Sequence, residues 1–404
     1  MKLLVALPES PDPQGGTASK YFGPLVRGFC DLGASVTVLA VRGSAAHPED
    51  LSYFGGRDVR IELFDPPRPR PIVERKFRSL ARPGWELSTS AFGGALRREA
   101  DQPYDAILAE LPSTAMALEE DPRQMVSLLY FRHLDLLPAG LGRESVRERF
   151  ERLQVLRSEK RVLRRARRLR VLSQRMATVA RLRGAIAEPA VIPLCLDPDL
   201  YIPVEAPETP TVGILGSMFW PPSRRAAEVF LTRIAPRLRT RVTGVRFIVG
   251  GWRAKEFLGH LVTAPDIELL DSFPDSRKAF AFLSVLVCTP PVGTGMKVKV
   301  LEAMAFGVPA VVNDEGWEGL EADQEPPVVL ARTDDEIVES TVELLHDPAK
   351  RRRLSAEGPR CIRRSFSPSQ VCPQLLEVLA RAPKGRAIVA PASIIEGRSE
   401  LTCL

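Results

Sequence analysis

The chain has 404 residues, of which 45% are hydrophobic and 26% are charged, and its formal net charge is +6. This composition is typical of a globular protein, and the length predicts two or three domains rather than one core. No apolar run approaches the roughly 18 residues that a bilayer-spanning helix requires, so we expect no such helix. Pro and Glu follow the first apolar run, KLLVAL, which favours a first strand over a signal peptide. We therefore expect a cytoplasmic location.

Cysteine spacing and charge exclude some common sites. The six cysteines form no CxxC pair and only four histidines are present, which disfavours a structural zinc site and disulfides and predicts buried free thiols. Residues 143–183 carry 15 Lys and Arg against 4 Asp and Glu. Because aromatic residues are not interleaved with these basic residues and no nucleic-acid-binding motif accompanies them, we expect no nucleic acid partner. A solvated helix face or an anionic partner surface would explain the block.

Strand and helix patterns alternate through the N-terminal half. Buried strands are predicted at 2–8, 35–41, 59–65, 104–111 and 126–131 and in the segments RLRVLSQ and AVIPLCL, and a helix at 20–33. Units of this kind predict a parallel, doubly wound sheet. Four prolines between Pro198 and Pro210 then mark a linker.

The alternation restarts after this linker. Strands are predicted in TVGILGS, VRFIVGG, DIELLDS, LSVLVCTPP and PAVVN, and helices at about 224–238, 276–282, 297–306 and in the segments TDDEIVESTVELLHD and SPSQVCPQLLEVLARA. The sequence therefore predicts a second α/β domain. Two such domains place a cleft between the carboxyl ends of their sheets, where open α/β sheets bind ligands.

The segment VGTGMKVKVLEAMAFG, which begins at Val292, connects a predicted strand to a predicted helix. Its glycines permit a tight turn, and the helix N-terminus with Lys297 and Lys299 favours an anion such as a diphosphate. It is neither a Walker A loop nor a dinucleotide fingerprint. Glu302 lies among apolar residues, where a buried carboxylate needs donors. A ribose diol beside the diphosphate would supply them; a lysine partner or solvent exposure is the alternative.

The longer segment GTGMKVKVLEAMAFGVPAVVNDEGWEGL resembles the donor-binding signature of retaining family 4 glycosyltransferases with the GT-B fold. Six other segments are similar to signatures of that family in the same order, over nearly the whole chain: PQGGTASKYF, FRHLDL, VIPLCLDPDLYIP, GILGSMFWPPSRRAAEVFL, ELLDSFPDSRKAF and LLHDPAKRRRLSAEGPRCIRRSFSPSQV. The resemblance implies an α/β fold of GT-B architecture, with two Rossmann-like doubly wound domains facing across a cleft. It also implies a retaining transferase that uses a UDP- or GDP-sugar and needs no cofactor or essential metal.

The resemblance also implies roles for individual residues. The catalytic residues would be His133, Lys297 and Glu302. The donor-binding residues would be Gly15, Gly16, Gly216, Ser217, Gly293, Thr294, Gly295, Met296, Lys297, Lys299 and Glu302. Glu110, at a strand end, and Trp85, in the basic insertion at 66–99, are expected on the acceptor side. The chain departs from the family pattern at Thr294, which replaces the first glutamate of E-x7-E, and leaves the sugar open.

The domain assignment follows the same resemblance. We expect an N-terminal acceptor-side domain at 1–205, a C-terminal nucleotide-sugar-binding domain at 206–365, a helix at 366–383 packing back toward the N-terminal domain, and a flexible tail at 384–404. The expected partners are a nucleotide sugar and a small-molecule, lipid-linked or glycan acceptor. The insertion at 66–99 is compatible with peripheral contact at the inner membrane face and equally with a solvated helix pair. A nucleotide-sugar epimerase of the same architecture and a catalytically degenerate GT-B binding protein are the alternatives.

Overall fold

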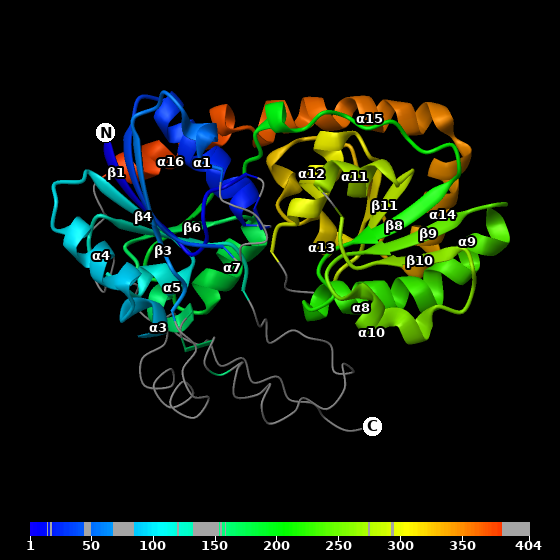
Figure 1. The fold of residues 1–404 in the computed structure, drawn as a ribbon, viewed down its shortest axis with the longest axis horizontal. Coiled ribbons are helices and arrows are strands. Elements are labelled where there is room, and N and C mark those ends of the chain that lie inside the picture. Colours follow the sequence, from blue (N-terminus) through cyan, green and yellow to red (C-terminus); the bar gives the residue numbers. More distant parts are fainter. Residues whose placement is uncertain are drawn as a thin grey trace, which may run out of the picture.

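The computed structural model describes residues 1–13, 15–16, 18–43, 50–67, 85–118, 121–131, 153, 156–157, 159–273, 275–291 and 295–381. Two parallel sheets lie side by side, each flanked by helices (Figure 1). The predicted fold class of two doubly wound α/β domains is confirmed. His133, Gly293, Thr294, residues 68–84 of the insertion at 66–99 and the tail lie outside the described residues.

The N-terminal sheet has seven parallel strands in the order β3-β2-β1-β4-β5-β6-β7. The strands are β1 Lys2–Leu7, β2 Ser35–Val41, β3 Val59–Phe64, β4 Ala106–Glu110, β5 Gln124–Leu128, β6 Arg168–Val171 and β7 Pro189–Val191. The helices include α1 Ser19–Asp31, α3 Trp85–Ser88, α4 Ala91–Ala100, α5 Pro112–Ala115 and α7 Gln174–Leu182. The strand order reverses direction between β1 and β4, and such a switch point opens a crevice at the carboxyl ends of these strands.

The C-terminal sheet has six parallel strands in the order β10-β9-β8-β11-β12-β13. The strands are β8 Thr211–Leu215, β9 Arg246–Gly250, β10 Ile267–Leu270, β11 Val285–Cys288, β12 Ala310–Val312 and β13 Val329–Leu330. The helices include α8 Pro221–Val229, α9 Ala235–Arg241, α10 Ala254–Leu258, α11 Ser276–Ala281, α12 Val298–Phe306, α13 Asp314–Trp317, α14 Asp334–His346, α15 Pro348–Cys361 and α16 Pro368–Ala380. The switch point of this sheet lies between β8 and β11.

Local chemistry explains most element boundaries. The side chains of Ser173, Asp275 and Thr333 cap α7, α11 and α14 by accepting hydrogen bonds from backbone N–H groups in the first turns. Three predictions need correction. The strand predicted at 126–131 is β5, which begins two residues earlier because the polar Gln124 is buried and pairs with Ile107. The helix predicted at 224–238 begins at Pro221, since proline suits a first turn, and continues into α9 through a π-helical segment at 230–234. The third is the prediction of five strands after the linker, which omits the short edge strand β13.

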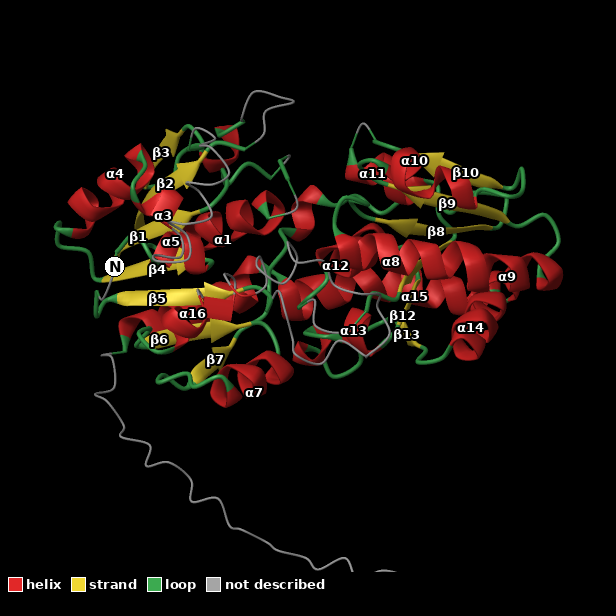
Figure 2. Cartoon of the chain, turned by 90° about the horizontal axis from the view of Figure 1, so that it is seen from below, coloured by secondary structure: helices red, strands yellow, loops and turns green. Residues whose placement is uncertain are grey.

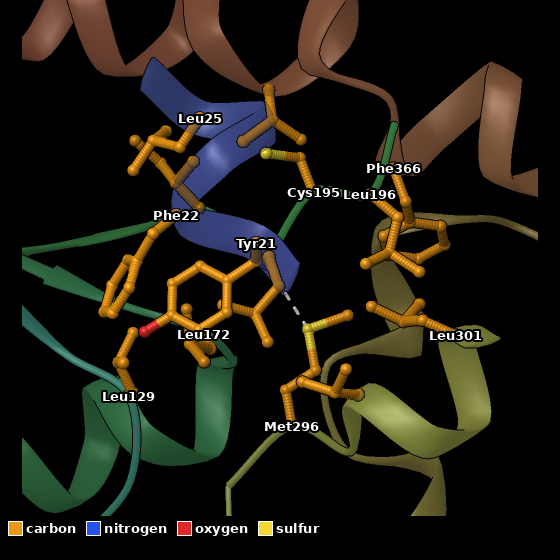
Figure 3. Close-up of a cluster of buried hydrophobic side chains, with 14 of the residues drawn as sticks. Tyr21, Phe22, Leu25, Leu129, Leu172, Cys195, Leu196, Met296, Leu301 and Phe366 are labelled. Atoms are coloured by element: carbon orange, nitrogen blue, oxygen red, sulfur yellow. Dashed lines mark hydrogen bonds between the residues drawn. The ribbon is translucent and has the colours of Figure 1, made fainter. Parts of the chain in front are cut away.

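Strands of the two sheets point toward the boundary between the domains, which Figure 2 shows most clearly for β5 and β8. An apolar cluster fills this boundary, with Tyr21 and Phe22 on α1 packed near Met296 and Leu301 of the C-terminal domain (Figure 3). The Leu194 N–H donates to Met296 Sδ at 3.4 Å. At this boundary the two domains therefore pack against each other through buried apolar side chains.

The last helix crosses back to the N-terminal domain. α15 runs along the C-terminal domain and α16 lies against α1 (Figure 1). The Cys372 thiol donates to Leu25 O at 3.6 Å, and Arg168 Nη1 donates to Leu379 O at 2.7 Å. None of the helices in the described part of the chain is both long enough and apolar enough to cross a membrane.

Candidate functional site

The turn before α12 lies at the domain boundary, and Gly295 makes this position possible. Its φ is +67°, and a Cβ there would lie 2.5 Å from Leu129 O and 3.0 Å from Tyr130 Cβ. Any other residue would have to adopt a strained backbone and would also collide with the N-terminal domain. The described half of the predicted phosphate turn therefore rests directly on the end of β5.

Lys297 follows this turn as the residue preceding α12. It is 8% exposed, and its Nζ donates to the carbonyl oxygen of Gly295. Burial lowers the pKa of Lys297 to about 8. The positive charge of Lys297 therefore lies inside the protein and not in solvent, and near pH 8 only part of the molecules carry it.

Lys299 points toward the loop that connects β8 to α8. Its Nζ donates to Ser223 Oγ at 3.4 Å, and a Cβ on Gly216 would lie only 2.4 Å from that nitrogen. Since α8 begins at Pro221, the ammonium and the N-terminus of this helix lie on the same side of the loop that contains Gly216 and Ser217. Two sources of positive potential therefore meet at the carboxyl end of β8, a suitable place for an anion.

The two arginines near the start of α8 have other partners. Arg225 Nη1 donates to Glu228 Oε2 at 3.2 Å, and the Arg224 guanidinium lies 4.7 Å from the centre of the Phe257 ring. Their side chains are engaged along α8 and with α10. The cation beside Gly216 is accordingly Lys299.

Glu302 lies in the first half of α12 and is 6% exposed. Its Oε1 accepts a hydrogen bond from Lys20 Nζ at 2.7 Å, and the same Nζ donates to Ser276 Oγ at 2.5 Å. Lys20 belongs to α1, whereas Glu302 and Ser276 belong to the C-terminal domain. A single ammonium therefore joins the domains at the carboxylate for which the sequence predicts a ribose contact.

The glycine loop after β1 packs on an acid. A Cβ on Gly16 would lie 2.1 Å from Glu9 Oε1, and the Gly15 N–H donates to Asp12 O at 2.9 Å. Burial raises the pKa of Glu9, and hydrogen bonds from Ser19 and from the Gly16 backbone oppose this rise. The Glu9 carboxylate thus packs directly on Gly16, in the loop that leads to the start of α1.

Glu110 lies in the interior of the N-terminal domain and has no exposed surface. It accepts hydrogen bonds from Ser127 Oγ at 2.9 Å and from Arg170 Nη1 at 3.1 Å. Burial raises the pKa of its carboxyl group, and the Arg170 charge opposes this. In this position Glu110 is part of a buried polar pair and does not face the cleft. Trp85 begins α3.

The structure adds three residues that the sequence analysis did not single out: Lys20, Ser276 and Glu318. Lys20 follows the glycine loop directly and is one of few lysines in an arginine-rich chain, a signal that could have been noticed. Glu318 is 4% exposed and accepts a hydrogen bond from Ser173 Oγ, across the domain boundary, at 2.8 Å. Nothing in the local pattern around Glu318 or Ser276 indicates these partners.

The remaining chemistry is limited. Within the described ranges, no three His, Cys, Asp or Glu side chains gather in a way that could hold a metal ion. The predicted free thiols are confirmed for five cysteines, of which Cys195, Cys288, Cys361 and Cys372 are buried and Cys30 is partly exposed. The described site combines cations and two helix N-termini with one carboxylate, an arrangement that suits an anion linked to a polyol.

Comparisons with known families agree with this arrangement. A family model described as "Glycosyl transferase 4-like domain" matches residues 16–195, and one described as "Glycosyl transferases group 1" matches residues 209–347. Each match falls on one of the two sheets. No curated relative matches the sequence.

Solved structures share the fold at low sequence identity. HepE of Anabaena, solved in complex with UDP and glucose, is 16% identical with a TM-score of 0.64, over 94% of this chain and 99% of HepE. Sucrose-phosphate synthase of Thermosynechococcus elongatus is 14% identical with a TM-score of 0.68, over 94% and 98%. TarM of S. aureus, in a complex containing UDP, is 10% identical with a TM-score of 0.63, over 94% and 100%. The predicted GT-B architecture is confirmed.

Proposed function

Since the chain belongs to the group 1 glycosyltransferases, we propose that it transfers a sugar from a UDP- or GDP-sugar to an acceptor hydroxyl with retention of anomeric configuration. The donor would bind at the carboxyl ends of β8 and β11, and the acceptor would enter from the N-terminal domain. HepE and TarM, which share the fold, were solved with UDP, which supports a uridine nucleotide as the first candidate.

The observation that carries this proposal is the position of Lys299. Its ammonium reaches across from α12 to the β8–α8 loop and lies so close to Gly216 that a Cβ there would be 2.4 Å from it. A diphosphate there would receive a charge-assisted hydrogen bond from Lys299 and one from the N–H of Ser223, the first residue of α8 that has a backbone donor because Pro221 and Pro222 have none. As the bond to the sugar breaks, negative charge grows on this leaving group, so prearranged cations lower the barrier.

Other residues would complete the donor site. Glu302 would accept hydrogen bonds from the ribose hydroxyls, and the turn that contains Gly293, Thr294, Gly295 and Met296 would pass beside the sugar. Gly15 and Gly16 would bring the loop after β1 near the diphosphate, with Ser217 opposite. His133 would lie near the transferred sugar. Transfer with retention would proceed by attack of the acceptor on the same face of the sugar from which the leaving group departs. The proton released by the acceptor and the departing diphosphate then stay close together.

The charges that would stabilise the diphosphate all come from the protein, so we propose metal-independent transfer. Activity that is unchanged by EDTA and by added Mg²⁺ is the expected result. The acceptor would be a small molecule, a lipid-linked saccharide or a glycan.

A ligand series tests the donor site. Thermal shift and calorimetry with uridine, UMP, UDP, GDP and their sugar conjugates should show tightest binding for one diphosphate series. In Lys299→Ala we expect UDP affinity to fall about tenfold while uridine affinity is unchanged, because one charged hydrogen bond to phosphate is lost. Arg225→Ala is the matched control, because it removes a cation of α8 that pairs with Glu228 and does not contact the loop. Equal affinity of wild type and Lys299→Ala for UDP would contradict the assignment.

A transfer assay separates the alternatives. Proton NMR of the first product formed from a UDP-α-sugar should show an α-linkage; a β-linkage would overturn retention. Release of a free epimerised sugar without an acceptor would indicate an epimerase. Tight donor binding with neither hydrolysis nor transfer to any acceptor in a broad panel would indicate a binding protein.

A further inference from the structure

We propose that Glu318 is a positioning residue of the donor site, which holds the Lys297 ammonium at the turn before α12 and joins this turn to the N-terminal domain through Ser173. The inference rests on the proposed function and adds Lys297, a predicted donor-binding residue, to Lys299 as a cation that contacts the diphosphate of a bound donor. Glu318 would touch neither the sugar nor the phosphate and would act through Lys297.

Both charged groups are enclosed by protein. Lys297 is 8% exposed and Glu318 is 4% exposed. Lys297 Nζ donates to Gly295 O, and Glu318 Oε1 accepts from Ser173 Oγ. Glu318 Oε2 is buried and lacks a hydrogen-bond partner within the part of the chain that the structure describes. A buried carboxylate oxygen without a donor is costly unless a positive charge lies nearby.

The backbone segments that carry the two charges are in direct contact. Gly319 has a φ of +88°, and a Cβ there would lie 2.9 Å from Met296 Cγ. Met296 immediately precedes Lys297, and Gly319 immediately follows Glu318. The glycine therefore lets the segment after α13 close over the turn, which places a carboxylate and an ammonium on touching segments.

The electrostatic surroundings of Lys297 single out the same partner. Burial lowers the pKa of Lys297, and Glu318 is the strongest of the groups that oppose this effect, ahead of Cys288 and Glu315. Lys299, on the same helix, adds to the lowering. Of the acids facing Lys297, Glu315 already accepts a hydrogen bond from Arg175 Nη1 at 2.7 Å, so its charge is partly neutralised. Glu318 is the acid left to balance Lys297.

Ser173 ties this pair to the other domain. Its Oγ accepts a hydrogen bond from the Met176 N–H at 3.0 Å, as the N-cap of α7, and donates its own hydrogen to Glu318. Because the cap fixes the direction of the hydroxyl group, the carboxylate is oriented only while the domains are together. Domain contact would thus set the electrostatic environment of Lys297.

The pairing also bears on the departure at Thr294. In the pattern that this chain resembles, an acid stands at that position, and here it is a threonine. The buried carboxylate beside this turn comes instead from the segment after α13.

The test is the pH dependence of UDP binding, measured by calorimetry from pH 7 to pH 10 on the full chain. In wild type, affinity should fall as pH rises through about 8, because Lys297 loses its proton. Glu318→Gln removes the charge that raises the Lys297 pKa, so the fall should move about one pH unit lower. Glu318→Asp keeps the charge and should return the midpoint toward that of wild type. Ser173→Ala should weaken binding about two- to tenfold at every pH, because it removes a hydrogen bond but no charge.

Each outcome of these measurements supports or overturns a named part of the proposal. A midpoint in Glu318→Gln equal to that of wild type, or an equal loss of affinity at every pH, overturns the positioning role and leaves the donor site in place. Ser173→Ala binding like wild type overturns the link to the N-terminal domain. Absence of UDP and GDP binding by the folded wild type at every pH overturns the donor site and this inference together. If Glu318→Gln does not fold, the midpoint of Glu318→Asp against wild type serves, since a shorter arm should move it to lower pH by a smaller amount.

Discussion

Replacing Glu302 by alanine tests whether its carboxylate holds the ribose of the donor. Glu302 is 6% exposed and lies one helical turn from the lysines that would contact the diphosphate. Hydrogen bonds to a charged group contribute about 1.5–3 kcal/mol. The loss of this acceptor should therefore raise the Kd for UDP about 10- to 150-fold. Calorimetry with UDP and with UMP should show similar factors, because both nucleotides carry the ribose diol.

The same substitution also breaks an ion pair between the domains, so it needs a matched control. Lys20→Met removes that ion pair, in which Lys20 Nζ lies 2.7 Å from Glu302 Oε1, but leaves the carboxylate in place. The side chains of Lys20 and Glu302 are 19% and 7% exposed. Loss of this mostly buried contact should lower the free energy of unfolding by about 1–3 kcal/mol. UDP affinity in Lys20→Met should stay within about threefold of wild type.

The comparison between the two variants is what decides the role of Glu302. If Lys20→Met weakens UDP binding as much as Glu302→Ala does, the effect comes from the domain contact and the ribose assignment is wrong. If Glu302→Ala binds UDP within twofold of wild type while remaining folded, the assignment is likewise wrong. Urea unfolding of both variants provides the stability reference.

Three further substitutions have expected results. Gly216→Ala places a Cβ 2.4 Å from the Lys299 ammonium at a φ of +150°, so UDP affinity should fall at least fivefold in calorimetry and the free energy of unfolding should fall by about 1–3 kcal/mol; unchanged affinity would contradict the site. Gly295→Ala, at a φ of +67°, should cost about 1–3 kcal/mol in urea unfolding; a loss below about 0.5 kcal/mol would show that the turn can move away. Burial raises the pKa of Asp323, but hydrogen bonds led by that from Arg364 outweigh it and lower this pKa to about 2. The contribution of Asp323 to the free energy of unfolding is therefore present above about pH 4 and is lost as pH falls toward 2. Asp323→Asn should be less stable than wild type by roughly 1–2 kcal/mol above pH 4, and this difference should shrink between pH 4 and pH 2. A difference that does not depend on pH would refute this.

Some of the fold could be predicted because its cause is local. Buried strands such as β1 and β8 are runs of apolar residues bounded by glycine and proline, and α14 begins after its cap Thr333, the first residue of the predicted helical segment. Repetition of these units is enough to predict two parallel sheets. Cation and glycine spacing in the segment before α12 likewise predicts an anion site, since the residues involved are neighbours in the chain.

The partners of the charged side chains could not be predicted in this way. Lys20 and Glu302 are separated by 282 positions, and Ser173 and Glu318 by 145. The sequence alone placed Glu110 at a strand end, and only the packing of β4, β5 and β6 showed it buried against Arg170. Periodicity specifies which face of an element is apolar, but not which element covers it. Thus the sequence by itself determined the two sheets and predicted an anion site at the turn before α12. Docking of the domains decided which cation meets which carboxylate, because a buried charge takes its partner from whatever the neighbouring domain brings within reach.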